Sequence, residues 1–253
     1  MTQRVLYGIH AVRQLLLSRA DSVECVYLQA DLGAEREARL AEVLSRAVRV
    51  RRVPADELER LTGTSKHQGV AATATVSGPL SEAAARELLA AFERPLVLVL
   101  DGVQDPRNFG ACLRAADGAG ADLVVVARNR NVDLTPVVSK VAAGAAESQG
   151  IAQVGNLVRF LDSIKGQGLW IVGADAEATS SLYELDLSVG TALVLGGEGE
   201  GMRRLTRETC DHLVSLPMRG AVSSLNVAVA AGIFLYECVR QRSVRLPGTH
   251  PLR

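Results

Sequence analysis

Polar side chains that could do chemistry gather at three places in the second half of the chain. The first is DGVQDPRNFGACLRAADGAGAD at 101–122, where a buried strand turns at Asp105 and a helix starts near Asn108. Ligands of parallel sheets bind at the carboxyl ends of the strands, so Asn108 and Arg114 are candidates to face one site. On spacing alone, a helix cap and a surface arginine are the favoured interpretation, because Asn and Asp are usual at helix starts.

The second cluster is LVLGGEGEGM at 193–202, in which a strand runs directly into a glycine-rich loop. Gly197, Gly199 and Gly201 spell GxGxG, and glycines let backbone N–H groups approach an anion or a cofactor closely. As a dinucleotide fingerprint the motif is weak, because it follows a late strand and no acidic residue ends a strand about 20 positions on. So many glycines are a costly connector if they only turn the chain, which favours a functional loop.

The third cluster is LPMRGAVSSLNVAVAAGIFLYE at 216–237, with a strand, a loop, a Ser-Ser start and a long helix. Ser223, Ser224 and Asn226 are by themselves best explained as helix caps. Almost every helix position is apolar or small, which predicts a helix buried on all sides, in a core or at a subunit interface.

Taken together and in this order, NFGACLRAA, LVLGGEGEGM and LPMRGAVSSLNVAVAAGI resemble the three motifs of the SpoU (TrmH) family of SPOUT methyltransferases. Three ordered motifs over about 130 residues are far more specific than a lone GxGxG. YGIHAVRQLL at 7–16 and KHQGVAA at 66–72 extend the resemblance to all but the tail. The resemblance implies an S-adenosylmethionine-dependent enzyme that methylates the 2'-hydroxyl of a guanosine ribose, in the branch that acts on 23S rRNA.

The same resemblance assigns roles to individual residues. The implied catalytic set is Arg114, Asn108, Glu198, Ser224 and Asn226. The implied S-adenosylmethionine contacts are Gly196, Gly197, Leu216, Met218 and Leu225. The family assigns activation of the ribose hydroxyl to Arg114. Because an arginine holds its proton too strongly for a general base, we expect Arg114 to stabilise the nascent alkoxide and the adjacent phosphate.

The resemblance further implies a homodimer formed through the catalytic domain and a deep trefoil knot, with the last strand and helix threaded through an earlier loop. Knots are rare, so hydrophobic periodicity does not predict one. The expected RNA contacts lie in the first domain and across the site, at Arg51, Arg52, Lys66, His67 and Arg107. For each of these alone, a solvated surface charge is the favoured interpretation.

The elements that must position these residues fall into two predicted regions. Residues 1–76 predict a small α/β domain with three strands at 23–29, 48–53 and 69–76 and three helices. The family resemblance implies that this domain binds RNA and is similar to a ribosomal protein. Residues 77–94 predict a linker with a helix capped by Ser81, and 244–253 a disordered tail. Short aliphatic runs separated by helix-length segments predict that 95–243 form a parallel sheet with helices on both faces. These runs are 95–102, 121–127, 169–173, 191–197 and 212–217.

Composition sets wider limits. The chain has 253 residues, of which 48% are hydrophobic, and 28 basic side chains balance 28 acidic ones, which excludes a disordered or collagen-like chain. The four cysteines have no CxxC spacing and do not pair with the four histidines at ligand intervals, so no metal is expected. No signal peptide and no apolar stretch of about 18 residues is present, which predicts a reduced, cytoplasmic protein without a membrane partner.

Three other functions stay open on the sequence. A tRNA guanosine 2'-O-methyltransferase of the same family would carry the same motifs, although the N-terminal domain and the KHQG segment favour rRNA. A catalytically idle RNA-binding protein with this fold would not need Asn108, Arg114, Glu198 and Asn226 together. A nucleotide-dependent oxidoreductase rests on GxGxG alone, and titration with NAD and with S-adenosylmethionine would separate it from the others.

Overall fold

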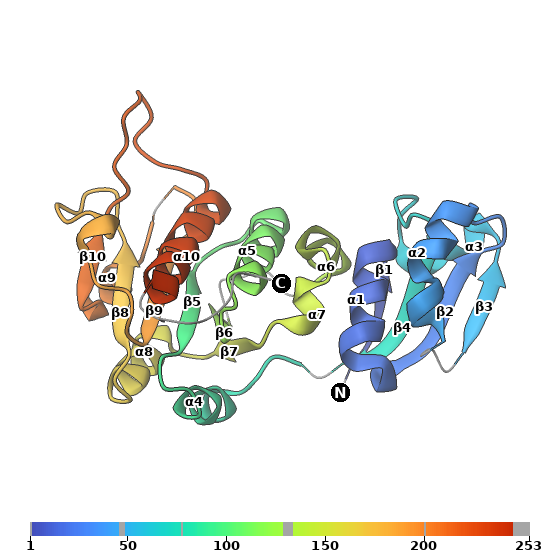
Figure 1. Cartoon of the computed structure of the whole chain (residues 1–253), viewed down its shortest axis with the longest axis horizontal. Helices are drawn as coiled ribbons and strands as arrows, with labels where there is room; N and C mark the ends of the chain where they lie inside the picture. The colour runs from blue at the N-terminus through green and yellow to red at the C-terminus, as the bar shows by residue number, and fades with distance from the viewer. Residues whose placement is uncertain (1, 46–48, 77, 129–133, 200, 245–253) are drawn as a thin grey trace. The chain divides into compact units, whose positions relative to one another are not determined.

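The computed structural model describes residues 2–45, 49–76, 78–128, 134–199 and 201–244. The predicted disordered tail therefore lies outside the described residues, except for Val244. The chain folds into two compact units, one of Met1–Gly78 with Asp133–Ser148 and one of Pro79–Val132 with Gln149–Arg253. Figure 1 labels their helices and strands.

The first unit is built on a four-stranded sheet with the order β1-β4-β2-β3. Strand β4 pairs antiparallel with β1 and with β2, and β2 pairs parallel with β3. The strands are β1 Thr2–Tyr7, β2 Val23–Gln29, β3 Val50–Val53 and β4 Val70–Val76. The prediction of three strands missed β1, because its sequence TQRVLY places two polar residues and one charged residue before the apolar ones.

The helices of the first unit include a segment that the sequence placed in the second domain. They are α1 Ile9–Arg19, η1 Ala20–Ser22, α2 Ala34–Leu44, α3 Ala55–Thr62, α6 Pro136–Ala142 and α7 Ala145–Ser148. Helices α6 and α7 pack on α1, and α6 also packs on β1. At Gly144 a Cβ atom would lie 2.4 Å from Cβ of Gln14, so only glycine fits there. The predicted domain at 95–243 is thus wrong in its continuity, because this short segment packs with the first unit.

The second unit contains a six-stranded sheet in which all pairs are parallel, with the order β10-β8-β9-β5-β6-β7. The strands are β5 Leu96–Asp101, β6 Leu123–Ala127, β7 Ile151–Val154, β8 Trp170–Ala174, β9 Thr191–Gly196 and β10 His212–Val214. The prediction of a parallel sheet is confirmed. Strand β7 was not predicted, because IAQV is only four residues long and contains a glutamine.

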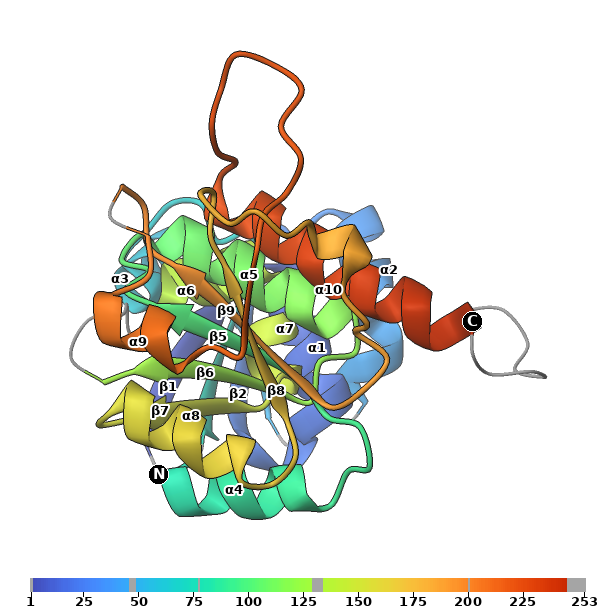
Figure 2. The same cartoon turned by 90° about the vertical axis from the view of Figure 1, so that its left-hand side faces the viewer.

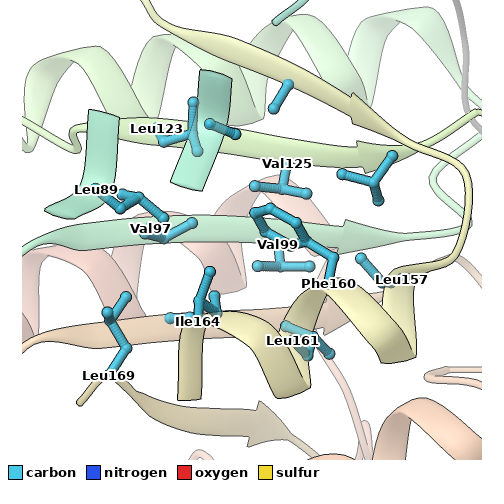
Figure 3. Packing of buried hydrophobic residues seen from close by; sticks show 14 of the residues in the cluster. Leu89, Val97, Val99, Leu123, Val125, Leu157, Phe160, Leu161, Ile164 and Leu169 are labelled. Carbon is cyan, nitrogen blue, oxygen red and sulfur yellow. The ribbon is translucent and has the colours of Figure 1, made fainter. Parts of the chain in front are cut away.

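Helices cover both faces of this sheet. Helices α5 Pro106–Gly118 and α10 Val227–Val244 pack together on one face, whereas α4 Glu82–Ala90, α8 Leu157–Lys165 and α9 Arg204–Thr209 lie on the other (Figure 2). Val99 and Val125 of the sheet pack against Phe160 and Ile164 of α8 in the core (Figure 3). Within the described residues, no helix is long and apolar enough to cross a membrane.

The helix predicted in the linker belongs to this core. Ser81 caps α4 as expected, since its Oγ accepts the N–H of Ala84 at 3.3 Å. Leu89 of α4 is buried in the core cluster of the second unit. Glu82 accepts the N–H of Gly155 at 2.8 Å. Helix α4 is therefore an integral part of the second unit, although the sequence predicted a connector.

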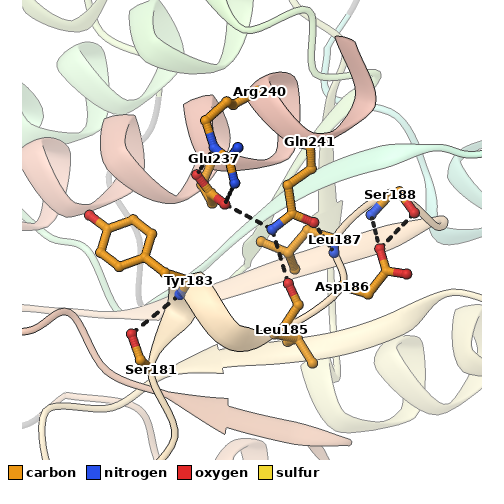
Figure 4. A network of polar contacts seen from close by, with 9 residues as sticks. All are labelled: Ser181, Tyr183, Leu185, Asp186, Leu187, Ser188, Glu237, Arg240 and Gln241. Atoms are coloured by element: carbon orange, nitrogen blue, oxygen red, sulfur yellow. Dashed lines mark hydrogen bonds and ion pairs between the residues drawn. The ribbon is translucent and has the colours of Figure 1, made fainter. Parts of the chain in front are cut away.

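Side chains near the end of α10 hold the chain that leads into β9 (Figure 4). Gln241 donates from Nε2 to the carbonyl of Leu185 at 3.0 Å, and its Oε1 accepts the N–H of Leu187 at 2.8 Å. The buried carboxylate of Glu237 accepts hydrogen bonds from Gln241 at 2.8 Å and from Arg240 at 2.7 and 2.8 Å. These bonds fix the last helix to the segment just after η2 Leu182–Glu184.

We expect Glu237→Gln to lower stability at neutral pH and to have less effect in acid. Hydrogen bonds from Arg240 hold the pKa of Glu237 below its usual value against the opposing effect of burial, and Gln241 adds to the lowering. A lowered pKa contributes stability that is present above the unfolded value and is lost as the pH falls through the folded value. Loss of a hydrogen bond to a charged group costs about 2 kcal/mol. Thermal unfolding from pH 7 to pH 3 measures this, with Glu208→Gln in an exposed pair as control. A pH-independent difference would contradict it.

Candidate active site at the carboxyl edge of the parallel sheet

The order of strands reverses between β5 and β9, where Asp101 pairs with Gly196 at the ends of the two strands. From β5 the chain continues to β6 and β7 on one side, while β9 lies on the other. The loop after β5 leads into α5 on one face, and the loop after β9 leads into α9 on the opposite face. Ligands of open parallel sheets bind at such a point, outside the carboxyl ends of the strands.

Three of the five predicted catalytic residues meet there through hydrogen bonds. Asn108, in the first turn of α5, donates from Nδ2 to the carboxylate of Glu198. Asn226 donates from Nδ2 to Oδ1 of Asn108 at 3.0 Å, and its own Oδ1 accepts the N–H of Ala228 at 2.9 Å. Asn226 is therefore a cap of α10 and also a link between the first and third motifs. The start of α5 is capped by Asp105, whose side chain accepts the N–H of Arg107 at 2.9 Å.

Arg114 and Ser224 lie outside this hydrogen-bonded set. Arg114 is exposed on α5, six residues after Asn108, a rise of about 9 Å along the helix. Within the described residues its guanidinium has no hydrogen bond and no ion pair. Ser224 is exposed in the loop before α10 and likewise makes no hydrogen bond in the described part of the chain. A guanidinium that has no partner among the described residues is available to an anionic group of a ligand.

The glycine loop is shaped by close packing as well as by backbone freedom. Gly197 and Gly201 form a bridge across the loop, and Gly199 and Gly201 have φ of 89° and 69°. A Cβ atom on Gly196 would lie 2.0 Å from the carbonyl carbon of Gly201, and one on Gly197 would lie 2.2 Å from the carbonyl oxygen of Gly102. Gly196 and Gly197, predicted as cofactor contacts, therefore also let the loop fold back on itself and pack against the loop after β5.

The predicted apolar cofactor contacts come from the irregular segment between β10 and α10. Leu216 and Met218 are half-buried close to the end of β10, whereas Leu225 is 38% exposed. Figure 2 shows this segment extending away from the sheet before it returns to α10. All three stay predicted cofactor contacts, and Leu225 has the largest exposed fraction of the three.

The thiol of Cys112 lies on α5 close to Glu198. Burial, and to a smaller degree the negative charge of Glu198, raises the pKa of Cys112 to about 12. The group is therefore a neutral thiol at physiological pH and not a nucleophile. No group of three or more His, Cys, Asp or Glu side chains in the described ranges could hold a metal ion.

Most of the predicted RNA contacts are on the surface, but His67 is not. Arg51 pairs with Glu57 at 3.4 Å, Arg52 pairs with Glu37, and Lys66 and Arg107 are exposed. His67 is only 4% exposed, and its Nδ1 accepts the N–H of Gly69 at 3.0 Å. The expectation of a surface contact at His67 is therefore wrong, because this histidine holds the turn before β4.

Sequence reasoning missed one pair at this site. Asp101 ends the apolar strand β5 with a fully buried side chain, and Arg203, at the start of α9, binds it. The two residues are separated by 102 positions, so no spacing pattern connects them. The only sequence signal for this pair was the single acidic residue at the end of the apolar strand LVLVLD, which indicates a buried carboxylate in need of a partner.

Two known families match the chain. The SpoU rRNA Methylase family matches residues 95–236, which is more than half of the chain, and the RNA 2'-O ribose methyltransferase substrate binding family matches residues 5–78. The parallel sheet, the three motifs at its carboxyl edge and this match agree. The chain belongs to the SpoU rRNA methylase family.

Curated relatives are similar over nearly their whole length. The 23S rRNA (guanosine-2'-O-)-methyltransferase RlmB of Ralstonia nicotianae is 49% identical over 247 residues, 95% of this chain and 97% of the relative. The enzyme of the same name from Pseudomonas putida is 47% identical over 245 residues, 95% of this chain and 97% of the relative.

Solved structures agree on the fold. An RNA 2'-O ribose methyltransferase has a TM-score of 0.77 at 28% identity and covers 95% of this chain and 89% of its own. The SpoU methyltransferase AviRb from Streptomyces viridochromogenes, solved with AdoMet, has a TM-score of 0.79 at 24% identity, with 96% and 91% covered. The second likeness supports the fold alone.

Proposed function

We propose that this chain is an S-adenosylmethionine-dependent methyltransferase that methylates the 2'-hydroxyl of a guanosine ribose in 23S rRNA. The observation that carries the proposal is the hydrogen-bonded set of Asn108, Glu198 and Asn226 at the reversal point of the sheet. Arg114 lies on α5, as Asn108 does, and has no partner among the described residues. The names of the curated relatives supply the substrate class and the position of the methyl group.

The residues present fit S-adenosylmethionine. Its adenosine needs apolar walls and main-chain hydrogen-bond partners, and half-buried Leu216 and Met218 lie in the segment after β10 while the glycine loop follows β9. The main chain of Gly199, at positive φ without a Cβ atom, leaves room for close approach. When bound, the cofactor would supply a methyl group already activated by its sulfonium, so no metal is needed for the electrophile.

The remaining work falls to the protein side chains, which must orient the ribose hydroxyl, help to remove its proton and exclude water. We assign to the guanidinium of Arg114 the stabilisation of the developing alkoxide and the neighbouring phosphate, because it is exposed on α5 and has no partner within the described residues. Asn108 is held by Glu198 on one side and by Asn226 on the other, so its amide has a fixed orientation toward a ligand. Ser224 belongs to the same proposed set through its place in the third motif.

We further infer that the enzyme is a cytoplasmic homodimer joined through the second unit. In the single chain, Val229 of helix α10 is 52% exposed and Tyr236 is 53% exposed, so of the two predicted locations, a core or a subunit interface, these side chains fit the interface. Such apolar exposure supports a partner subunit on this helix. Sedimentation showing a single-chain mass at working concentrations would contradict the dimer. The trefoil knot also stays a proposal, supported by the hold of α10 on the chain at 185–189.

The first unit is proposed to bind the RNA, and replacement of both Arg51 and Arg52 with alanine tests this. Each lost phosphate contact is expected to weaken rRNA binding and to reduce the slope of log affinity against log salt by about 1. Arg60→Ala is the matched control, because Arg60 is exposed in the same unit and pairs with Asp56 one turn away. An unchanged slope in the double variant would reject these contacts.

The decisive test is transfer of a labelled methyl group from S-adenosylmethionine to 23S rRNA that lacks the modification, with tRNA in parallel and the modified position mapped. Label on one rRNA guanosine is expected. Label on tRNA alone would favour the tRNA enzyme of the same family. No label despite cofactor binding would favour an assembly intermediate as the substrate or an idle RNA-binding protein.

A further inference from the structure

Asp101 is the one acidic residue of strand β5, and its side chain is fully buried at the edge where the site lies. A buried carboxylate is costly unless it is paired and hydrogen-bonded. Its Oδ1 accepts from Nε of Arg203 at 2.6 Å and lies 2.5 Å from Nη2, and its Oδ2 accepts the main-chain N–H of Arg203 at 3.0 Å. Both carboxylate oxygens of Asp101 are therefore used by one residue.

The main chain of Asp101 holds the other end of the same loop. Its carbonyl oxygen accepts the N–H of Gly197 at 3.0 Å. One residue thus binds the first and the last position of the loop between β9 and α9, whose described residues, 197–199 and 201–203, include Glu198 and three glycines. Because Gly201 and Met202 pack directly on Gly196, the loop closes on itself between these two anchors.

We propose that Asp101 and Arg203 are a positioning pair that sets the shape of the glycine loop, so that Glu198 meets Asn108 and the loop backbone is presented to S-adenosylmethionine. This inference rests on the proposed function. In this role neither residue touches the substrate or the cofactor, since Asp101 is buried and acts through Arg203 and Gly197. The effect therefore falls on cofactor binding and not on RNA affinity.

The test uses the full chain with Asp101→Asn and with the double variant Asp101→Asn/Arg203→Gln. The double variant removes both charges and so leaves no unpaired buried ion, which keeps folding comparable with the original chain. Arg204→Gln is the control, because the neighbouring Arg204 is exposed and pairs only with Glu208 in the described residues. Arg203→Lys retains the charge and the main-chain hydrogen bond, and it is expected to retain part of the affinity.

We expect the double variant to bind S-adenosylmethionine about tenfold more weakly, because binding must then order a loop that the pair no longer holds in shape. Its affinity for rRNA and its unfolding temperature should stay close to those of Arg204→Gln. Unchanged cofactor affinity in a folded double variant would overturn the positioning role. Equal loss of rRNA affinity would overturn it as well, because that outcome indicates a general structural defect.

A second measurement is independent of the proposed function. Amide hydrogen exchange of the loop 197–203 should be faster in the double variant than in Arg204→Gln without any cofactor present. Unchanged exchange would refute the pair's hold on the loop. In contrast, failure of the unsubstituted protein to transfer a methyl group to 23S rRNA would refute the proposed function. The exchange result would then still test whether the pair holds the loop.

Discussion

Replacement of Arg114 with alanine is expected to lower the rate of methyl transfer at least a hundredfold while leaving S-adenosylmethionine binding nearly unchanged. Removal of one donor that stabilises a developing oxyanion costs about 10²–10³ in rate. The guanidinium is exposed and has no partner within the described residues, so its loss leaves no unpaired group behind and the folded structure is expected to be retained.

Single-turnover methyl transfer and cofactor titration on the same preparation measure this prediction. Arg114→Lys retains the charge without the planar fork, so it should recover only part of the rate if the guanidinium binds alkoxide and phosphate together. Arg159→Ala serves as control, since it deletes an exposed arginine of α8 on the opposite face of the sheet. Near-normal turnover of Arg114→Ala would remove this residue from the catalytic set.

Gly196→Ala is expected to abolish measurable cofactor binding and to destabilise the second unit. The new Cβ atom would lie 2.0 Å from the carbonyl carbon of Gly201 and 2.2 Å from the nitrogen of Met202. Both neighbours are backbone atoms, so the clash is relieved only if the loop moves. Overpacking of this kind costs about 1–3 kcal/mol or more.

The matched control is Gly220→Ala, in the irregular segment before α10. A Cβ atom there would have no neighbour within 4 Å, and Gly220 has no positive φ. Calorimetric titration with S-adenosylmethionine and thermal unfolding of both variants give the comparison. If Gly196→Ala bound the cofactor as Gly220→Ala does, the packed loop would have no part in the cofactor site.

The sequence was sufficient to predict those strands and helices whose pattern of apolar residues lies within one short segment. The aliphatic runs of β5 and β6 are buried over their whole length, and such runs predict a sheet covered on both faces. The strand β7 has too few apolar residues for this signal. The packing of 136–148 on α1 could not be predicted, because it depends on surfaces more than a hundred residues away in the chain.

The candidate site was predictable only in part for the same reason. Spacing alone favoured a helix cap at Asn226, and the structure shows that cap, but it also shows the bond to Asn108 across 118 positions. The family resemblance predicted that Asn108 and Asn226 belong to one site, but neither it nor periodicity predicted the hydrogen bond between them. Neither the family resemblance nor residue spacing predicted the pair of Asp101 and Arg203, since ion pairs between distant segments leave no pattern in the sequence.

The packing of α6 and α7 with the first unit affects how the protein can be cut. The chain passes between the two units at 78–79, at 132–133 and again at 148–149, so the first unit is not an appendage on one linker. A protease cut between Gly78 and Pro79 would leave the fragment 1–78 held by its packing on 136–148. Removal of that fragment by truncation would instead expose the apolar faces of α6 and α7. A stable chain without residues 1–78 would thus need polar residues in place of the apolar ones that α6 and α7 pack against α1.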